Sequence, residues 1–315
     1  MTAALVSARF QAVVDNVERV IHGQTSVIRL AMVCLLAEGH LLIEDIPGVG
    51  KTTLAKALAA SLRCEWRRIQ FTPDLLPSDV TGVTIYNRDR AAFEFRPGAI
   101  FANVILGDEI NRASPKTQAA LLEAMEEGQV TADATTYPLP RPHMVIATQN
   151  PVERQGTYPL PDGQLDRFLM RVAMGYPGRS AEMVMLATHG RQSALADVKP
   201  VVDTDDVMAM VAHARSVHVA ESVGVYLLDL AEATRAHRSL ALGASPRAAL
   251  ALLRAARAFA VAQGRNHVLP DDMKAMAPYV WSHRLVTAPD ARVSGVTGAQ
   301  VVSEVLARVP VPVGP

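Results

Sequence analysis

The segment LLIEDIPGVGKTT, residues 41–53, has the residue types that bind a phosphate group, with one exception. The usual pattern is G-x-x-x-x-G-K-[ST], and Asp45 stands where the first glycine is expected. That position only begins the turn out of the preceding strand, and an aspartate side chain can cap such a turn by hydrogen bonding. We therefore interpret the segment as a phosphate-binding loop, in preference to an ordinary turn between a strand and a helix.

The residues that follow meet the chemical needs of a bound nucleotide. Gly48 and Gly50 let the backbone approach phosphates closely, because neither has a Cβ atom in the way. The helix that starts after them offers unpaired N–H groups and the positive end of its dipole to an anion. Lys51 supplies a cation for the β- and γ-phosphates, and Thr52 supplies a hydroxyl for Mg²⁺. These residue types predict a site for a nucleotide and Mg²⁺.

Two acids at the end of an apolar run could do chemistry on that nucleotide. The segment VILGDEINRA, residues 104–113, predicts a buried strand that ends in Asp108 and Glu109. Ligands bind beyond the carboxyl ends of the strands in open α/β sheets. Asp108 can hold a water of Mg²⁺, and Glu109 can polarise an attacking water. Acids also cap many strand ends, so the pair becomes a strong signal only in a domain that has the phosphate loop.

An amide and three arginines are further candidates. The segment VIATQNP, residues 145–151, predicts another buried strand, and Asn150 at its end would lie beside the γ-phosphate if this strand neighbours the strand before the loop. A solvated loop amide is the alternative. Arg167 and Arg247 lie on predicted helices and could each supply a cation, although most such arginines are surface charges. Arg171 lies one helical turn beyond Arg167 and competes for any role given to it.

The hydrophobic pattern predicts that alternating strands and helices carry these residues. Apolar runs predict strands over 40–43, 68–71, 101–106 and 144–148. Helical spacing predicts helices over 8–22, 24–38, 50–62 and 163–171, and another helix is bounded by Ser114-Pro115 and Gly128. Alternation around polar turns predicts hairpins over 82–97 and 130–139. Such an order of elements favours a parallel sheet covered on both faces.

The pattern changes after GYPGRS, residues 175–180, which is the best candidate for a linker. Beyond it, helical spacing predicts helices over 181–190, 204–218, 221–236, 246–262, 270–283 and 298–308. That region shows no strand pattern. We therefore predict an α/β domain over residues 1–178, with the two hairpins as insertions, and a helical second domain over 179–315 that ends in a short frayed tail.

Composition narrows the class of protein. The chain has 315 residues, of which 50% are hydrophobic, and its 31 Lys and Arg balance 31 Asp and Glu. That balance does not require nucleic acid or an anionic membrane as a partner. Cys34 and Cys64 are better explained as thiols in a reducing compartment than as a disulfide. The N-terminus lacks a signal-peptide pattern, and the apolar run over 27–37 is shorter than the ~20 residues of a membrane span. We expect a cytoplasmic protein.

Several segments together resemble the MoxR family of AAA+ ATPases, namely GHLLIEDIPGVGKTTLAKALA, GDEINRASPKTQAALLEAMEEGQVT, IATQNPVERQGTYPLPDGQLDRF, LGASPRA and the HR pair at 283–284. The resemblance extends over about residues 23–285. It implies an α/β AAA+ domain, with a parallel sheet and helices on both faces, followed by an all-α lid domain. The two predicted hairpins resemble the helix-2 and pre-sensor insertions of this clade.

The resemblance also implies roles for single residues. ATP would bind to Pro47, Gly48, Val49, Gly50, Lys51, Thr52 and Thr53. Mg²⁺ would be held by Thr52 and Asp108. Asp108 and Glu109 would form the Walker B motif, with Glu109 as its catalytic residue, and Asn150 would be sensor 1. Arg167 would be the arginine finger, and Arg247 would be sensor 2.

By the same resemblance, the chain forms a ring, usually a hexamer, that hydrolyses ATP to remodel or mature partner proteins, as a chaperone does. Family members often act with a protein that has a von Willebrand A domain. Each nucleotide would lie between two subunits, with Arg167 of one subunit serving the ATP of the next. Such a finger is typically worth ~10³–10⁵ in rate, so an isolated subunit would be a poor ATPase.

Three other functions share parts of this pattern. An ATPase subunit of a metal chelatase keeps the same site and differs in its client. A nucleic-acid motor or loader would need a basic pore, which the balanced charge and the 5% aromatic content do not favour. A non-catalytic nucleotide switch would not need the complete set of acidic and basic residues. We expect protein clients, no nucleic acid and no membrane insertion.

Overall fold

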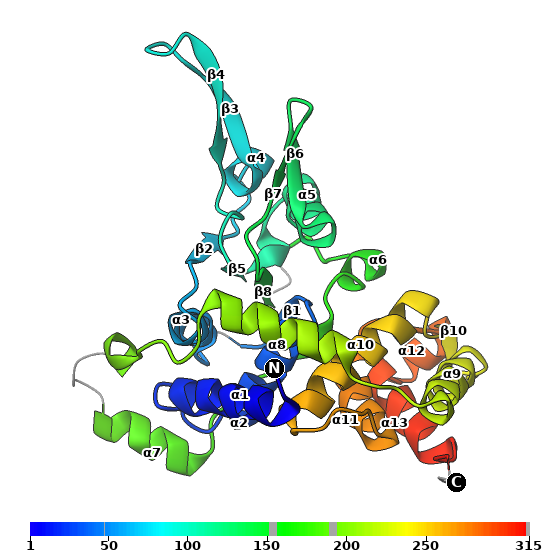
Figure 1. Ribbon diagram of the computed structural model, residues 1–315. Helices are drawn as coiled ribbons and strands as arrows, with labels where there is room; N and C mark the ends of the chain where they lie inside the picture. The colour runs from blue at the N-terminus through cyan, green and yellow to red at the C-terminus, as the bar shows by residue number, and fades with distance from the viewer. Residues whose placement is uncertain (47, 151–155, 189–193, 313–315) are drawn as a thin grey trace.

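The computed structural model describes residues 1–46, 48–150, 156–188 and 194–312 (Figure 1). The helices are α1 (Ala3–Glu18), α2 (Thr25–Leu36), α3 (Lys51–Ser61), α4 (Pro77–Thr81), α5 (Pro115–Glu127), α6 (Asp162–Leu165), α7 (Arg179–Thr188), α8 (Thr204–Ser216), α9 (Glu221–Arg235), α10 (Pro246–Ala262), α11 (Pro270–Trp281), α12 (Pro289–Val293) and α13 (Gly298–Arg308), with 3-10 turns η1 (Ile110–Arg112) and η2 (Ala194–Asp197). The strands are β1 (Leu41–Glu44), β2 (Trp66–Gln70), β3 (Gly82–Asn87), β4 (Ala92–Pro97), β5 (Val104–Asp108), β6 (Gln129–Ala132), β7 (Thr135–Pro138), β8 (Met144–Gln149), β9 (Met170–Val172), β10 (Leu240–Leu242) and β11 (Val286–Thr287). The last three residues of the predicted frayed tail, 313–315, lie outside the described residues.

Five strands form a parallel sheet in the order β2-β5-β8-β1-β9. The predicted strands correspond to β1, β2, β5 and β8, and β9 is an additional strand at one side of the sheet. Leu41 of β1 lies opposite Ile146 on one side and Met170 on the other. Because all five strands run the same way, their carboxyl ends share one edge of the sheet. The loops that follow β1, β5 and β8 therefore meet at that edge.

Each face of the sheet is covered by its own apolar core. Leu41 and Ile43 of β1 join a core that includes residues of α1, α2 and α3, whereas Leu42 joins a second core that includes residues of α5. Ile105 of β5 and Val145 of β8 belong to the second core, and their chain neighbours belong to the first. Burial on both faces explains why these strands are unbroken apolar runs in the sequence. The predicted parallel sheet with two covered faces is confirmed.

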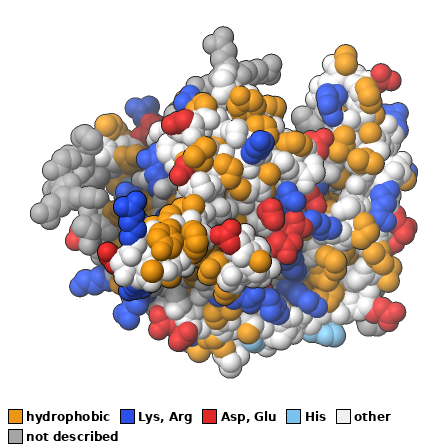
Figure 2. Space-filling model, turned by 90° about the horizontal axis from the view of Figure 1, so that it is seen from above, with side chains coloured by type: hydrophobic (Ala, Val, Ile, Leu, Met, Phe, Trp, Pro, Cys, Tyr) orange, Lys and Arg blue, Asp and Glu red, His pale blue; other side chains and the backbone are white. Residues whose placement is uncertain are grey.

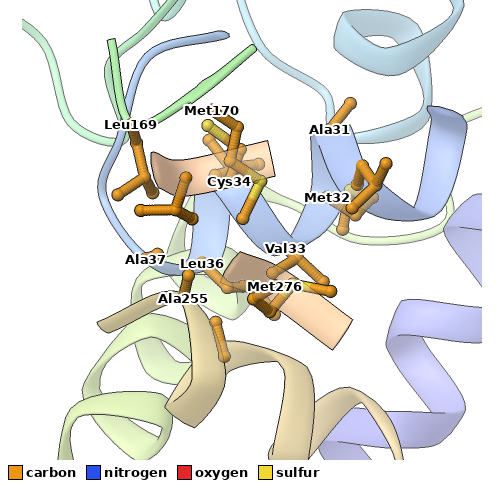
Figure 3. Close-up of a cluster of buried hydrophobic side chains, with 14 of the residues drawn as sticks. Ala31, Met32, Val33, Cys34, Leu36, Ala37, Leu169, Met170, Ala255 and Met276 are labelled. Carbon is orange, nitrogen blue, oxygen red and sulfur yellow. The ribbon is translucent and has the colours of Figure 1, made fainter. Parts of the chain in front are cut away.

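The first of these cores continues into the C-terminal helices. Figure 3 shows Met32 and Leu36 of α2 in one buried cluster with Ala255 of α10 and Met276 of α11. Helix α1 also packs against α10, and α2 packs against α8. Cys34 lies in this core as a free thiol, and Cys64 is also free and half-buried. The helices before the phosphate loop thus contact the predicted second domain, whose boundary near residue 178 stays a prediction.

Two hairpins project from the sheet at the same end of the molecule (Figure 1). Strands β3 and β4 pair antiparallel, and so do β6 and β7, at the two predicted positions. Phe95 of β4 stacks on Tyr137 of β7, with ring centroids 4.0 Å apart. Stacked aromatic rings bury a large apolar area in a fixed geometry. The stack therefore joins the two hairpins, although they come from separate parts of the chain.

The helix predicted over 163–171 is wrong over its second half. The chain forms α6, then a turn, and then strand β9. Met170 and Val172 are buried while Arg171 between them is half-buried, which is the alternation of a strand. Pairing with β1 gives this segment backbone partners and a buried face, so tertiary contact overrides the helical spacing. Arg167 consequently lies in the turn before β9 and not on a helix.

The C-terminal region is helical as predicted, but it also contains a small sheet. Strand β10 pairs antiparallel with β11. These strands have 3 and 2 residues, which is too short for an alternating pattern to be visible. The expectation that no strand occurs there was therefore wrong. In the described part of the chain, no helix combines the length and the apolarity needed to cross a membrane.

His40, just before β1, is a buried polar residue that joins two other elements. Its Nδ1 accepts a hydrogen bond from the Val145 backbone N–H at 3.0 Å, so Nε2 carries the proton and donates to the Met125 carbonyl at 3.1 Å. Burial, with a smaller effect of the neighbouring His143, lowers the pKa of His40 to about 3. A second proton on Nδ1 would face an N–H donor, so the folded protein keeps His40 neutral.

We predict that His40→Gln makes the stability of the isolated chain less sensitive to acid. The stability that depends on a neutral His40 is complete above its ordinary pKa of 6.5, and it is lost as the pH falls toward about 3, because only the unfolded chain takes up the proton. The slope for one such group is at most ~1.4 kcal/mol per pH unit. Glutamine can keep both hydrogen bonds and does not titrate. Urea unfolding of wild type and variant between about pH 5 and 7 measures the difference, and parallel pH profiles would contradict the prediction.

Candidate nucleotide-binding site

The loop after β1 forms an open cradle in front of helix α3. Gly48 and Gly50 have φ angles of 86° and 95°, in the left-handed region that favours glycine. A Cβ atom at either position would extend into open space, with no other group within 4 Å. The two glycines therefore leave open space in front of the loop, which a side chain would partly fill. Val49 packs against the first core, and Pro47, the other predicted loop residue, lies outside the described residues.

Lys51 begins α3 and points back along the loop. Its Nζ donates a hydrogen bond to the backbone carbonyl of Asp45 at 2.8 Å. Partial burial lowers the pKa of Lys51, and the attraction of Asp45, Asp108 and Glu109 opposes this effect. The ammonium group of Lys51 therefore lies among carboxylates at the carboxyl end of the sheet. A bound anion that brings a cation with it could replace some of the contacts between Lys51 and these carboxylates.

Asp45 caps the turn, and its carboxylate reaches a distant segment. One oxygen, Oδ1, accepts a hydrogen bond from the Ile46 backbone N–H at 2.7 Å. The other, Oδ2, accepts from the Gly175 backbone N–H at 2.5 Å. The side chain is buried, at 8% exposure. The residue that breaks the phosphate-loop pattern thus holds the start of the loop to the GYPGRS segment, a contact that the sequence did not indicate.

Asp108 ends β5 and is held by two neighbours. The Thr148 hydroxyl of β8 donates to its Oδ1 at 2.7 Å. Arg68 Nη2 of β2 contacts its Oδ2 at 2.6 Å. Neither partner was among the predicted site residues. Each lies on a strand that pairs with β5, so the order of the strands would have indicated them, and that order is not visible in the sequence.

Glu109 follows Asp108 in an uncommon backbone conformation. Its φ and ψ are 58° and 50°, which is left-handed for a residue with a side chain. Its backbone N–H donates to the Thr148 hydroxyl at 2.9 Å, which fixes this turn. The carboxylate accepts a hydrogen bond from Gln70 Nε2 at 2.9 Å and lies 3.4 Å from Arg112 Nε. Strain at one residue is typical of functional sites, where surrounding contacts hold it in place.

One cavity of about 330 Å³ brings most of the predicted residues together. It is lined by Gly48, Gly50, Lys51, Thr52, Thr53, Asp108, Glu109, Thr148 and Asn150. Asn150 is there because β8 pairs with β1, which is the condition that the sequence left open. Loop, acids and amide therefore face a single space.

The residues around this cavity fit a Mg²⁺ ion that enters with a nucleotide. Mg²⁺ prefers oxygen ligands and usually keeps several waters, with one or two protein ligands and phosphate oxygens completing its shell. The Thr52 hydroxyl and the Asp108 carboxylate line the cavity and offer oxygen atoms of this kind. Across the described residues, no group of three or more His, Cys, Asp or Glu could hold a metal ion without other help.

A second cavity of about 330 Å³ also adjoins the loop. It is lined by Gly48 and Val49 of the loop, by Tyr176 and Pro177 of the segment after β9, and by Glu182, Met185 and Leu186 of α7, and most of these side chains are apolar. Gly48 lines both cavities, so the two spaces meet at the loop.

Arg167 and Arg247 lie away from the first cavity and close to each other. Arg167 Nε contacts Glu126 Oε2 at 2.6 Å, and Arg247 Nη1 contacts Glu126 Oε1 at 2.9 Å. The hydrogen bond from Arg167 and the charge of Arg247 hold the pKa of Glu126 below its usual value. Arg171, the rival of Arg167, pairs instead with Glu44 at 3.3 Å.

Comparison with known proteins places the chain in a family. The family model described as "ATPase family associated with various cellular activities (AAA)" matches residues 40–170, and the model described as "AAA lid domain" matches residues 232–305. The chain is 47% identical over 300 residues to the uncharacterized protein YeaC of Bacillus subtilis (strain 168), covering 95% of this chain and 94% of that protein.

Two further relatives agree with these matches. The chain is 39% identical over 306 residues to Chaperone MoxR1 of Mycobacterium tuberculosis (strain ATCC 25618 / H37Rv), covering 94% of this chain and 81% of that protein. The crystal structure of a candidate ATPase from Cytophaga hutchinsonii superposes with a TM-score of 0.92 at 37% identity, covering 99% of this chain and 97% of that one. The chain belongs to the MoxR family of AAA+ ATPases.

Proposed function

We propose that the chain hydrolyses ATP with Mg²⁺, assembles into a ring and remodels or matures partner proteins. The observation that carries the proposal is the cavity shared by Lys51, Thr52, Asp108, Glu109 and Asn150. A phosphate cradle, a cation, two carboxylates and an amide around one space are the parts that phosphoryl transfer to water requires. Assays of ATP hydrolysis over a range of protein concentrations test the enzyme and its assembly together.

In this proposal each residue of the cavity has a separate task. Lys51 neutralises charge on the β- and γ-phosphates, and Thr52 and Asp108 orient Mg²⁺, which offsets phosphate charge when it is bound. Glu109 polarises the attacking water, and Asn150 orients the γ-phosphate or that water. Thr148 supports two of these groups at once, because its hydroxyl donates to the Asp108 carboxylate and accepts from the Glu109 backbone N–H.

The second cavity fits the base of the nucleotide. An adenine ring is flat and largely apolar on its faces, and ligand pockets of this kind are mostly apolar with a few polar groups. Val49, Pro177 and Met185 supply such a lining directly beside the phosphate cradle. ATP bound in this way would span both cavities and contact the segment that Asp45 holds through Gly175.

The positions of the two arginines support the proposed ring. Residues 167–169 adjoin His40, because the Leu169 N–H donates to the His40 carbonyl at 2.8 Å at the amino end of β1. The phosphate loop follows the carboxyl end of the same strand. Arg167 is therefore at the end of the sheet opposite to its own cradle, and Arg247 lies beside it because both contact Glu126. We propose that the two arginines serve the nucleotide of a neighbouring subunit, with Arg167 as the finger.

The clients are proposed to be proteins. The relative named Chaperone MoxR1 supports this class, and a protein with a von Willebrand A domain is the partner that we propose. A nucleic-acid motor is disfavoured by the balance of 31 basic and 31 acidic residues. On the face seen in Figure 2, Lys and Arg side chains are interspersed with Asp and Glu side chains. A pull-down with a hydrolysis-blocked variant would identify the client and separate this function from that of a chelatase subunit.

Glu109→Gln is expected to keep ATP binding and to lower turnover by about 10²–10⁴-fold, because the amide conserves shape but cannot polarise water. ATP affinity and hydrolysis are measured on the same preparation. Lys51→Ala is the contrasting variant: it removes a charge that touches phosphate before the reaction, so it should weaken ATP binding itself. Turnover of Glu109→Gln close to that of wild type would exclude Glu109 as the base.

Asp45→Ala is expected to destabilise the fold and to change ATP affinity by less than about tenfold, or ~1.4 kcal/mol. Two backbone N–H groups, of Ile46 and Gly175, lose their acceptor, which should lower the free energy of unfolding by about 1–3 kcal/mol. Urea unfolding and ATP titration measure the two effects separately. A larger loss of affinity with unchanged stability would mean that the carboxylate acts on the nucleotide directly.

A mixture of Arg167→Ala and Lys51→Ala subunits is expected to hydrolyse ATP faster than either variant alone. The first variant has an intact cradle and lacks a finger, and the second has the opposite defect, so some interfaces in mixed rings combine two intact halves. Hydrolysis is measured at concentrations where wild type assembles, with mixed rings verified by two affinity tags. Confirmed mixed rings without a gain would contradict a finger acting in trans, and rescue by Arg171→Ala in place of Arg167→Ala would move the role to Arg171.

A further inference from the structure

A single carboxylate, that of Glu126, contacts both of the arginines that we propose to serve the nucleotide of a neighbouring subunit. Glu126 lies in the last turn of α5, and its side chain is 32% exposed. Arg167, in the turn before β9, contacts one of its oxygens at 2.6 Å. Arg247, at the start of α10, contacts the other at 2.9 Å. These three segments are far apart in the sequence, and they meet at this group.

Two guanidinium groups on the two oxygens of one carboxylate must lie close together, and like charges at that distance repel. The carboxylate offsets this repulsion, because each guanidinium has the same anion between itself and the other. Charge-assisted hydrogen bonds of this kind also fix orientation, since the donors lie in the plane of the guanidinium. Glu126 therefore gathers the two arginines and orients both of them.

The other side of the pair is fixed by a second carboxylate. Asp166 Oδ2 lies 3.3 Å from Arg247 Nε, and Asp166 Oδ1 lies 2.7 Å from Arg284 Nε. Arg284 is only 4% exposed and donates to the Phe168 carbonyl at 2.7 Å and the Leu169 carbonyl at 2.9 Å. The segment that carries Arg167 is thus held from the lid side by Arg284, which leaves the direction of the Arg167 side chain to Glu126.

We propose that Glu126 is a positioning residue that converges Arg167 and Arg247 on one point, so that both can engage the same phosphate of a neighbouring subunit. The proposal rests on the trans role proposed above for these arginines. A guanidinium has five N–H donors. Arg167 contacts Glu126 through Nε, and Arg247 contacts it through Nη1. Both arginines therefore keep donors that can bind a phosphate while they contact Glu126. The orientation of the two guanidinium groups is thus fixed before the nucleotide binds.

The test compares Glu126→Gln with Glu123→Gln, an exposed acid one turn earlier on the same helix. In assembled rings, Glu126→Gln should lower kcat for ATP hydrolysis by about 10–100-fold, the effect of misplacing a catalytic group. It should leave the KM for ATP and the ring size unchanged, because the chain's own cradle is intact. Glu123→Gln should match wild type in all three measurements.

Two double-mutant cycles separate positioning from a general structural effect. In the first, the loss of kcat caused by Glu126→Gln should be smaller once Arg167→Ala is present, because one of the two groups that Glu126 positions is gone. In the second, unfolding of the isolated chain without nucleotide should show a favourable coupling between Glu126 and Arg167 that is larger than the experimental error. This second readout does not depend on hydrolysis.

The outcomes distinguish this inference from the proposed function. If Arg167→Ala hydrolyses ATP like wild type, both the proposed trans finger and the proposed role of Glu126 are contradicted. If Arg167→Ala is slow while Glu126→Gln has normal kcat, only the role of Glu126 is overturned. A higher kcat in Glu126→Gln would mean that the carboxylate restrains the arginines. An equal loss of kcat in Glu123→Gln, or a fully additive loss of kcat in the Arg167→Ala background, would mean that Glu126→Gln does not act by misplacing the arginines.

Discussion

The parallel pairing of β1 with β8 and β9 is the constraint on which the rest of the structure depends. Its register pairs Glu44 with Gln149, so the phosphate loop and Asn150 leave the same end of the sheet. Strand β5 ends at that edge with Asp108. A shift of one residue in any of these pairs would turn buried side chains to the wrong face and exchange the two apolar cores, which is why burial on both faces enforces the register.

That register concentrates negative charge, and much of the site's detail offsets it. Asp45, Asp108 and Glu109 approach one another at the edge, and each has a partner of its own: backbone N–H groups for Asp45, Arg68 and Thr148 for Asp108, and Gln70 for Glu109. Lys51 adds a cation among them. In the proposed function, Mg²⁺ and phosphates would exchange some of these internal partners for new ones, so the affinity for ATP is a difference between two sets of contacts.

Local sequence predicted the elements that carry a strong pattern and the residues that end them. The phosphate loop, the acids after β5, Asn150 and both hairpins could be found because each combines a motif with an apolar run or a turn. Strand β9 could not, because Phe168 and Leu169 mimic helical spacing and only pairing with β1 makes the segment a strand. Arg68, Gln70 and Thr148 depend on which strands are neighbours, and Glu126 on where α5 ends, so tertiary structure alone reveals them.

Strand β9 connects the two halves of the proposed composite site. At its amino end lies the ion pair between Arg167 and Glu126. Beyond its carboxyl end, the Gly175 backbone N–H donates to the Asp45 carboxylate at the start of the phosphate loop. The strand is 3 residues long and spans about 10 Å, so the arginine and the cradle of one chain are held apart by a rigid element of the sheet. In the proposed function, a second copy of the chain therefore supplies the arginine that acts on each bound phosphate.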